Sequence, residues 1–269
     1  MAGPVEMPDV GFGTYRLQDE TCVDAVRTAL DAGYRHLDTA RMYGNETAVG
    51  RGLRGSEVPR DDVFVATKVW HDSLERVSLL DSARASREAL GVDTLDLLYV
   101  HWPRGTYDPA ETLPALAEAR DDGLTRHIGV SNFTPSLLHE AGDHLDAPVL
   151  AHQVEMHPLC PQAELRDYAA DVGHRLVAYC PIARDAVSDV PEIVAVAEEY
   201  DATPAQISLA WVMAKGAVPI PKSATPANIR ENLAARRIDL DADDVARIDA
   251  IDRRERLVDP ADAPWNRGA

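Results

Sequence analysis

The chain has 269 residues and a formal net charge of −18, with 45 acidic against 27 basic side chains. A surface this acidic repels phosphate backbones and anionic lipids, so we expect neither nucleic acid nor membranes as partners. Hydrophobic residues make up 45% of the sequence, and no apolar run has the length of a membrane span, which favours a folded globule with a large core.

The N-terminus, MAGPVEMPDV, has neither a basic start nor the apolar stretch of an export signal, so we expect a cytoplasmic protein. The three cysteines, Cys22, Cys160 and Cys180, show no CxxC spacing and are predicted to be free thiols. Dense carboxylates stay hydrated, and their repulsion is screened, in a high-salt cytosol. A halophilic habitat is therefore a hypothesis, which stability rising with molar salt would support.

Eight apolar segments of strand length recur along the chain. They lie near residues 10–14, 36–39, 63–70, 95–102, 126–133, 149–157, 175–181 and 217–223. Segments with helical periodicity lie between them, at residues 21–33, 108–123, 134–144, 160–173, 203–216 and 225–234. Many of these begin with a capping residue followed by proline and end in glycine, which is typical of helices.

Repeated βα units with almost continuously apolar strands predict a parallel sheet that is buried on both faces. Eight such units close most naturally into an α/β fold of the (β/α)8 (TIM) barrel type, here a single domain over residues 1–269. An open doubly wound sheet is the alternative architecture. The segment after about residue 238 predicts one more amphipathic helix and a short polar tail, which we expect to fold over the barrel mouth.

The segment GRGLRG, residues 50–55, matches the glycine pattern of dinucleotide-binding loops. That pattern works only where it follows a strand and opens a helix. Here it follows a helical stretch and leads into SEVPRDD, so we interpret it as a chance match.

Polar residues follow several of the predicted strands, where a barrel places its active site. Asp38 and Tyr43 follow the second strand, Lys68 lies in the third and His101 in the fourth. We expect the ammonium of Lys68 to lower the pKa of the Tyr43 phenol, and Asp38 to hold Lys68 in place. His101 can hydrogen-bond an oxygen on which negative charge develops, so the group predicts protonation of a carbonyl oxygen.

Lysine is rare in this sequence: the only lysines are Lys68, Lys215 and Lys222, and every other fixed cation is arginine. A retained lysine favours a role that needs a compact charge with a tunable pKa. Lys222 and Ser223 directly precede a predicted helix that starts at Thr225 and Pro226. Free N–H groups, the helix dipole and an ammonium then meet at one place, which suits a phosphate group.

Six motifs in this order resemble the ordered motifs of the aldo-keto reductases, in particular the prokaryotic diketogluconate and aldehyde reductase branch. They are GYRHLDTARMYGNE, TKVW, YVHWP, GVSNF, QVEMHP and IPKSATPANIREN, and the resemblance runs from about residue 7 to 260. It implies a (β/α)8 barrel that binds NADPH in an extended form and reduces aldehydes or ketones. It also implies that Asp38, Tyr43, Lys68 and His101 form the catalytic tetrad, with Tyr43 as the proton donor.

The resemblance further implies a cofactor site that runs across the barrel mouth. It assigns Lys222, Ser223 and Thr225 to the 2′-phosphate of the adenosine ribose, and Glu231 and Asn232 to the adenine. It assigns the nicotinamide carboxamide to Ser131, Asn132 and Gln153, the face of the nicotinamide ring to Tyr179, and other cofactor contacts to Gly13 and Thr14.

Some positions depart from the pattern of the family. Asn228 stands where NADPH-preferring members usually carry arginine, and Arg230 leaves the helix from another side, so we expect NADPH while use of NADH stays open. His152 replaces a usual asparagine, and Tyr15 stands where many members have tryptophan. Because the loop after Trp102 and the tail are short, we expect an open substrate pocket lined by Tyr15, Trp70 and Trp102.

Two other functions remain as alternatives. A metal-dependent hydrolase would use His36, Asp38, Glu155 and His157 as ligands, but it leaves Tyr43 and Lys68 without a task. A protein that binds NADPH and acts as a redox-sensing partner without turnover would not need the tetrad. We therefore expect a monomeric reductase of a small carbonyl compound, without a metal.

Overall fold

The computed structural model describes residues 6–266. Eight parallel strands form one sheet in sequence order. The strands are β1 Phe12–Gly13, β2 His36–Asp38, β3 Phe64–Val69, β4 Leu95–Val100, β5 Thr125–Ser131, β6 Val149–Glu155, β7 Arg175–Tyr179 and β8 Val218–Pro219.

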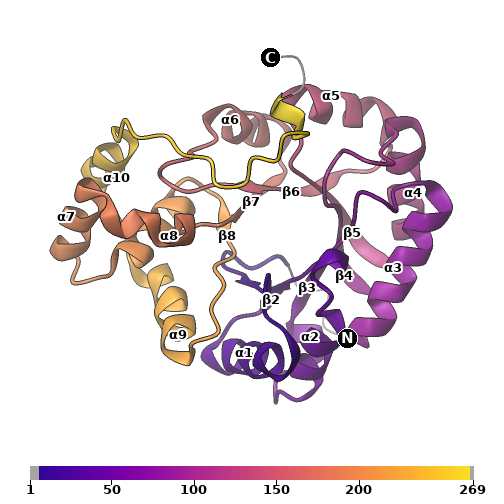
Figure 1. Ribbon diagram of the computed structural model, residues 1–269, viewed down its shortest axis with the longest axis horizontal. Helices are drawn as coiled ribbons and strands as arrows, with labels where there is room; N and C mark the ends of the chain where they lie inside the picture. Colours follow the sequence, from indigo (N-terminus) through magenta and orange to yellow (C-terminus); the bar gives the residue numbers. More distant parts are fainter. Residues whose placement is uncertain (1–5, 267–269) are drawn as a thin grey trace.

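The sheet closes on itself because the last strand bonds to the first. The N–H of Gly11 donates to the carbonyl of Pro219 at 2.9 Å, and the N–H of Gly13 donates to that of Pro221 at 3.0 Å. Figure 1 shows the resulting ring of strands with helices around it. The predicted (β/α)8 barrel is confirmed, and the alternative of an open sheet is wrong.

Helices follow the strands, as the sequence predicts, and pack around the barrel (Figure 1). They are α1 Asp19–Ala32, α2 Glu46–Arg54, α3 Arg76–Leu90, α4 Pro109–Asp121, α5 Pro135–His144, α6 Ala163–Val172, α7 Pro191–Glu199, α8 Pro204–Ala214, α9 Pro226–Ala234 and α10 Ala242–Asp249. Short 3-10 turns are η1 Arg41–Tyr43, η2 Arg60–Asp62, η3 Ala183–Asp189, η4 Ala235–Arg237 and η5 Pro264–Asn266. Within residues 6–266, none of the helices combines the length and apolarity that a membrane crossing requires.

The predicted helix starts are confirmed at α4, α5 and α8, where Asp108, Thr134 and Thr203 accept hydrogen bonds from backbone N–H groups of the first turn. The prediction at α6 is wrong, because this helix begins at Ala163 and the preceding Gln162 adopts a left-handed conformation with φ 50°. A left-handed residue interrupts the helical hydrogen bonding, so residues 160–162 lie outside the helix.

The glycines of GRGLRG serve packing. A Cβ added at Gly50 would lie 2.3 Å from the carbonyl oxygen of Leu90, and one at Gly52 would lie 2.7 Å from the side chain of Val26. Glycine therefore allows α2 to approach its neighbours closely. The interpretation of this segment as a chance match to a nucleotide loop agrees with its place in a helix.

Strand alternation decides which side chains enter the barrel. In β3, Phe64 and Ala66 belong to the small apolar cluster inside the barrel, whereas Val65 and Val69 pack under the helices. Because side chains two residues apart share a face, Lys68 also points inward, above that cluster. The same period brings Asp38 in from β2 and Gln153 in from β6.

The C-terminal tail crosses the barrel mouth, which Figure 1 shows as the yellow segment in front of the strands. The N–H groups of Leu257 and Val258 donate to the carboxylate of Glu155 at 2.7 and 2.8 Å. Further along the tail, Trp265 packs against Trp102 with ring centroids 5.6 Å apart. The tail is therefore fixed over the mouth, as the sequence predicts.

Candidate active site

A cavity of about 400 Å³ opens at the mouth, where the carboxyl ends of the strands meet. The predicted residues that line it are Asp38, Tyr43, His101, Tyr15, Trp102, Gly13, Thr14, Asn132, Gln153, Tyr179 and Lys222. They come from seven of the eight strands or from the loops that follow them. Residues far apart in the sequence are thus brought to one site.

A buried ion pair lies beneath this cavity. The ammonium of Lys68 donates to the Asp38 carboxylate at 2.5 Å and to the Thr39 carbonyl at 2.8 Å, and the two charged side chains are 0% and 2% exposed. Gln153 donates to the other Asp38 oxygen at 2.8 Å. Burial lowers the pKa of Lys68, and the Asp38 carboxylate opposes this shift. The pair keeps two charges in a place where an isolated charge would be very costly.

Tyr43 lies next to this pair, at the end of η1, and its ring centroid is 5.4 Å from the Lys68 nitrogen. Burial raises the pKa of the Tyr43 phenol well above its ordinary value, and the Asp38 carboxylate raises it further. The prediction of a net lowering of this pKa is therefore wrong. The physical reason is that Asp38 already balances the ammonium, so desolvation of the phenolate dominates. Tyr43 holds its proton firmly.

His101 faces the same space from the end of β4. Its ring centroid is 5.8 Å from that of Tyr43 and 4.9 Å from that of Trp70. Burial, with the charges of Lys68 and Arg104, lowers the pKa of His101 well below its ordinary value. The imidazole is therefore neutral at physiological pH, and one ring nitrogen carries a hydrogen that it can donate.

Trp70 does not line the cavity, so its predicted place is corrected. It contacts His101 and instead lines a separate hollow with Arg41 and Met42. The strand β3 ends at Val69, and the chain turns just after it, which carries the indole past the cavity wall. Met42 lines both spaces, and it was missed because nothing in its sequence context marks it.

A polar network occupies the side of the cavity formed by β5, β6 and β7. Asn132, with φ 63°, donates to the carbonyl of His101 and to the Ser131 hydroxyl, both at 3.0 Å. The hydroxyl of Tyr179 donates to the Asn132 oxygen at 2.8 Å. Ser131 donates to the Gln153 carbonyl at 2.9 Å and lies behind the lining residues. This network fixes the amides and the Tyr179 ring before any ligand arrives.

The predicted adenosine residues lie further out. Lys222 lines the cavity, but Ser223, Thr225, Glu231 and Asn232 do not. The Ser223 hydroxyl accepts from the N–H of Thr225 at 3.0 Å, and Thr225 itself does not cap α9. Glu231 accepts from the Thr203 hydroxyl at 2.9 Å, and Asn232 is buried.

Gly13 lines the cavity beside Ile220 and Lys222. A Cβ at Gly13 would lie 2.8 Å from the Ile220 carbonyl oxygen, so glycine allows the close approach of β1 to the chain that follows β8. Arg16 and Arg184 also line the cavity, and both have positive φ angles. These two arginines were not predicted, because the sequence of a loop does not show which way its side chains point.

The residues proposed for a metal site serve other purposes. Glu155 bonds to His157 at 2.9 Å and to the tail, and His36 lies at the opposite end of the barrel against Phe64. Among residues 6–266, no group of three or more metal-ligating side chains comes together. The metal-dependent hydrolase finds no support in this arrangement.

The sequence model of the aldo/keto reductase family matches residues 9–253 of this chain. The chain belongs to the aldo/keto reductase family. It is 39% identical to the methylglyoxal reductase DkgB of Yersinia pestis, over 95% of this chain and 97% of that protein. It is 41% identical to an aldo-keto reductase of Mycolicibacterium vanbaalenii, over 93% of this chain and 90% of that protein.

Solved structures agree with this membership. A putative 2,5-diketo-D-gluconic acid reductase B superposes with a TM-score of 0.92 at 35% identity, covering 96% of this chain and 92% of that one. An aldo-keto reductase, MGS-M4, from a deep-sea metagenome library gives the same TM-score at 32% identity over 96% of both chains. The chain is thus an oxidoreductase that reduces carbonyl compounds with a nicotinamide cofactor. The expected resemblance is confirmed, and neither alternative function is supported.

Proposed function

We propose that this reductase transfers a hydride to small aldehydes and ketones, with NADPH as its preferred cofactor and Asp38, Tyr43, Lys68 and His101 as its catalytic group. The observation that supports this is the buried Lys68–Asp38 pair directly beneath Tyr43 and His101 at the mouth cavity. An ion pair that only stabilises a core does not need a neutral imidazole and a protonated phenol beside it. The presence of both groups therefore favours a catalytic role for this pair.

In this mechanism the substrate carbonyl oxygen lies between Tyr43 and His101. When bound, a reduced nicotinamide would supply the hydride for the carbonyl carbon. The neutral His101 donates a hydrogen bond to the oxygen as negative charge develops, and Tyr43 delivers its proton to that oxygen. The phenolate left on Tyr43 is then stabilised by the nearby ammonium of Lys68, which Asp38 keeps charged and in position.

Because the pKa of Tyr43 is raised, its phenol gives up the proton only to an oxygen that has already gained negative charge. A phenol that holds its proton firmly does not ionise before the reaction, so it remains an acid over the whole physiological pH range. The Lys68 charge matters most once the proton has left. Interactions that are stronger in the transition state than in the ground state are the ones that accelerate a reaction.

The proposed cofactor positions follow the polar groups at the mouth. Ser131, Asn132 and Gln153 would bind the carboxamide, Tyr179 would stack on the ring, and Gly13 and Thr14 would flank the passage. Lys222, Ser223 and Thr225 would bind the 2′-phosphate, with Glu231 and Asn232 near the adenine. Asn228 supplies no cation there, so we expect a moderate preference for NADPH over NADH.

The substrate would lie beside Tyr15 and Trp102, which line the cavity. Relatives are named for methylglyoxal and for 2,5-diketo-D-gluconic acid. We propose a small dicarbonyl compound as the substrate here too, because the cavity is about 400 Å³ and must also hold the nicotinamide. We further propose that the protein works as a monomer in the cytoplasm, and that its acidity is suited to high salt.

A substrate panel run with both cofactors tests this function. We expect NADPH oxidation with methylglyoxal and other small aldehydes, unchanged by a chelator. Replacing Lys222 with alanine should raise the KM for NADPH much more than that for NADH, because only NADPH carries the 2′-phosphate. Equal effects on the two cofactors would contradict the phosphate role, and no oxidation of either cofactor would contradict the reductase itself.

A further inference from the structure

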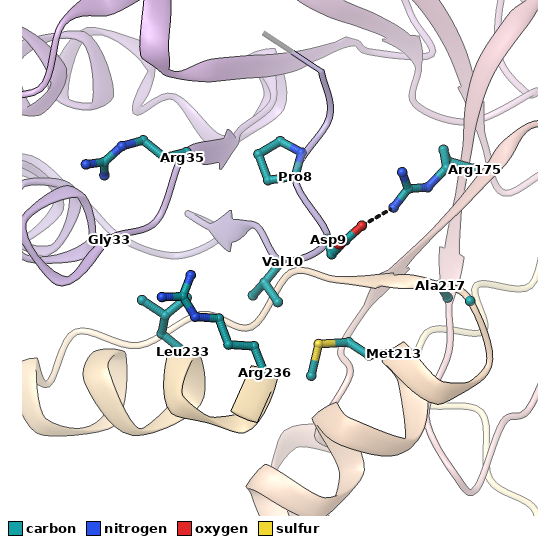
Figure 2. A pocket seen from close by; sticks show the side chains of 11 residues that line it. Pro8, Asp9, Val10, Gly33, Arg35, Arg175, Met213, Ala217, Leu233 and Arg236 are labelled. Atoms are coloured by element: carbon teal, nitrogen blue, oxygen red, sulfur yellow. Dashed lines mark hydrogen bonds and ion pairs between the residues drawn. The ribbon is translucent and has the colours of Figure 1, made fainter. Parts of the chain in front are cut away.

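A second cavity lies at the other end of the barrel, which we call the floor, where the strands begin. Its volume is about 570 Å³, and it is formed by residues just before β1, β2 and β8, by the first residue of β7 and by the end of α9 and η4. Figure 2 shows the side chains around it. It shares no lining residue with the mouth cavity.

The floor collects positive charge in a strongly acidic chain. A neighbouring cavity of about 250 Å³ shares Leu233 and Arg236 with the larger one, so the two spaces adjoin. Among the residues that the structure describes, Asp9 is the only acidic one that lines either of them. The cations that line them, here called the floor arginines, are Arg35, Arg175, Arg230, Arg236 and Arg237.

Most guanidinium donors of this group have no acceptor among residues 6–266. Arg236 and Arg237 make no side-chain hydrogen bond or ion pair with other residues between 6 and 266. Arg35 uses only its Nη1 atom, for the carbonyls of Leu30 and Tyr34 at 2.9 and 2.7 Å. Arg230 likewise uses only Nη1, for a carbonyl of its own helix at 3.2 Å.

The one carboxylate at the floor does little to balance these charges. Asp9 pairs with Arg175 at 2.8 Å, shown by the dashed line in Figure 2, but the Asp9 side chain is 87% exposed. Exposed ion pairs contribute little, because water and salt screen them. On the other side of the cavity, Arg236 extends from η4 beside Leu233 (Figure 2).

We propose that the floor arginines form a binding site for a small polyanion with two phosphate groups, separate from the active site. Guanidinium groups bind phosphate oxygens in pairs, and Arg236 stands between the two cavities, where it can reach both ends of such a ligand. Val10, Met213 and Leu233 form an apolar wall beside the charges, which lowers the local dielectric and strengthens the attraction.

Calorimetric titration of inorganic pyrophosphate into the protein saturated with NADP+ tests this site. The bound cofactor occupies the phosphate position at the mouth, so added heat reports the floor. We expect one site per chain, and Arg236→Gln should weaken binding about tenfold or more, since it removes a charge-assisted donor. Asp9→Asn should tighten binding, because it frees Arg175. A parallel titration with citrate distinguishes a phosphate ligand from a polycarboxylate of the same charge pattern.

Arg27→Gln provides the matched control, because Arg27 is an exposed α1 arginine that lines neither cavity. It removes the same charge from the chain and should leave pyrophosphate binding unchanged. Carbonyl reduction by Arg236→Gln should equal that of the native protein, which shows that the variant is folded. No saturable binding to the native protein, or equal weakening by Arg27→Gln and Arg236→Gln, would overturn the proposal.

Discussion

At the mouth of the barrel, the ammonium of Lys68 is fully buried and lies 2.5 Å from the Asp38 carboxylate. At the floor, Arg236 and Arg237 are exposed, and neither has an acidic partner between residues 6 and 266. A buried charge needs a partner to exist at all, and its pKa and those of its neighbours shift accordingly. An exposed charge keeps its ordinary chemistry and acts on ligands from solution. The mouth is therefore suited to proton transfer, and the floor to electrostatic binding.

The largest effect should come from Tyr43→Phe. Removing the phenol removes the proton donor, and we expect kcat to fall by about 10²- to 10⁴-fold. The affinity for NADPH, measured by quenching of protein fluorescence, should stay the same. Tyr107→Phe is the control, because it removes another half-buried tyrosine hydroxyl outside the mouth cavity. Full turnover by Tyr43→Phe would place the acid on another residue.

Lys68→Met should unfold more easily as well as lose activity. The substitution leaves the Asp38 carboxylate buried without its cation, which costs about 3–5 kcal/mol of unfolding free energy. For comparison, Arg51→Met removes one side of an exposed ion pair with Glu20 and should cost less than about 1 kcal/mol. Denaturant unfolding measures the free energy of unfolding of both variants. Similar losses in the two variants would mean that burial does not distinguish these pairs.

The floor also contains a buried titratable group, His36, and changing it should affect stability but not turnover. Burial lowers the pKa of His36 to about 4, and its two ring nitrogens have no hydrogen-bond partner among the described residues. The unfolded chain therefore binds this proton at a higher pH than the folded chain. The contribution of His36 to stability is full above about pH 6.5 and is lost as the pH falls toward 4.

The substitution His36→Leu removes the group whose protonation destabilises the folded chain at low pH. Near pH 5 the variant should be more stable than the native protein by about 2 kcal/mol, and near pH 7 the difference should shrink. Thermal unfolding across this pH range measures it. Carbonyl reduction near pH 7 should be unchanged, because His36 lies at the end of the barrel away from the mouth. A constant difference at all pH values would mean that packing, and not protonation, sets the effect.

The smallest effect should come from Glu155→Gln, which weakens the attachment of the tail. Burial alone would raise the pKa of Glu155, but hydrogen bonds from His157, Leu257 and Val258 hold it below its ordinary value. A neutral amide accepts these bonds less strongly. Since Val258 lines the mouth cavity, we expect KM for the carbonyl substrate to rise several-fold while kcat changes little. An equal fall in kcat would instead indicate a direct part in the reaction.

Much of this architecture follows from local patterns in the sequence. The apolar strands, the proline and glycine at helix ends and the period of two within strands were sufficient to predict the barrel and to place Asp38, Lys68 and His101 at its mouth. Trp70 was misplaced because a strand pattern does not say where the chain turns. Thr225 was expected to cap a helix, but its side chain accepts no hydrogen bond from the first turn of α9, which depends on loop geometry.

The sequence by itself determined the fold, the family and the set of polar groups at the strand ends, because these depend on residue type and spacing. Only the tertiary structure decided how those groups affect each other. Whether Lys68 acidifies Tyr43 depends on distance and burial, and Asp38 and desolvation reverse the expected sign. The floor arginines, spread from residue 35 to residue 237, likewise meet only because the strand starts and the end of α9 converge in space.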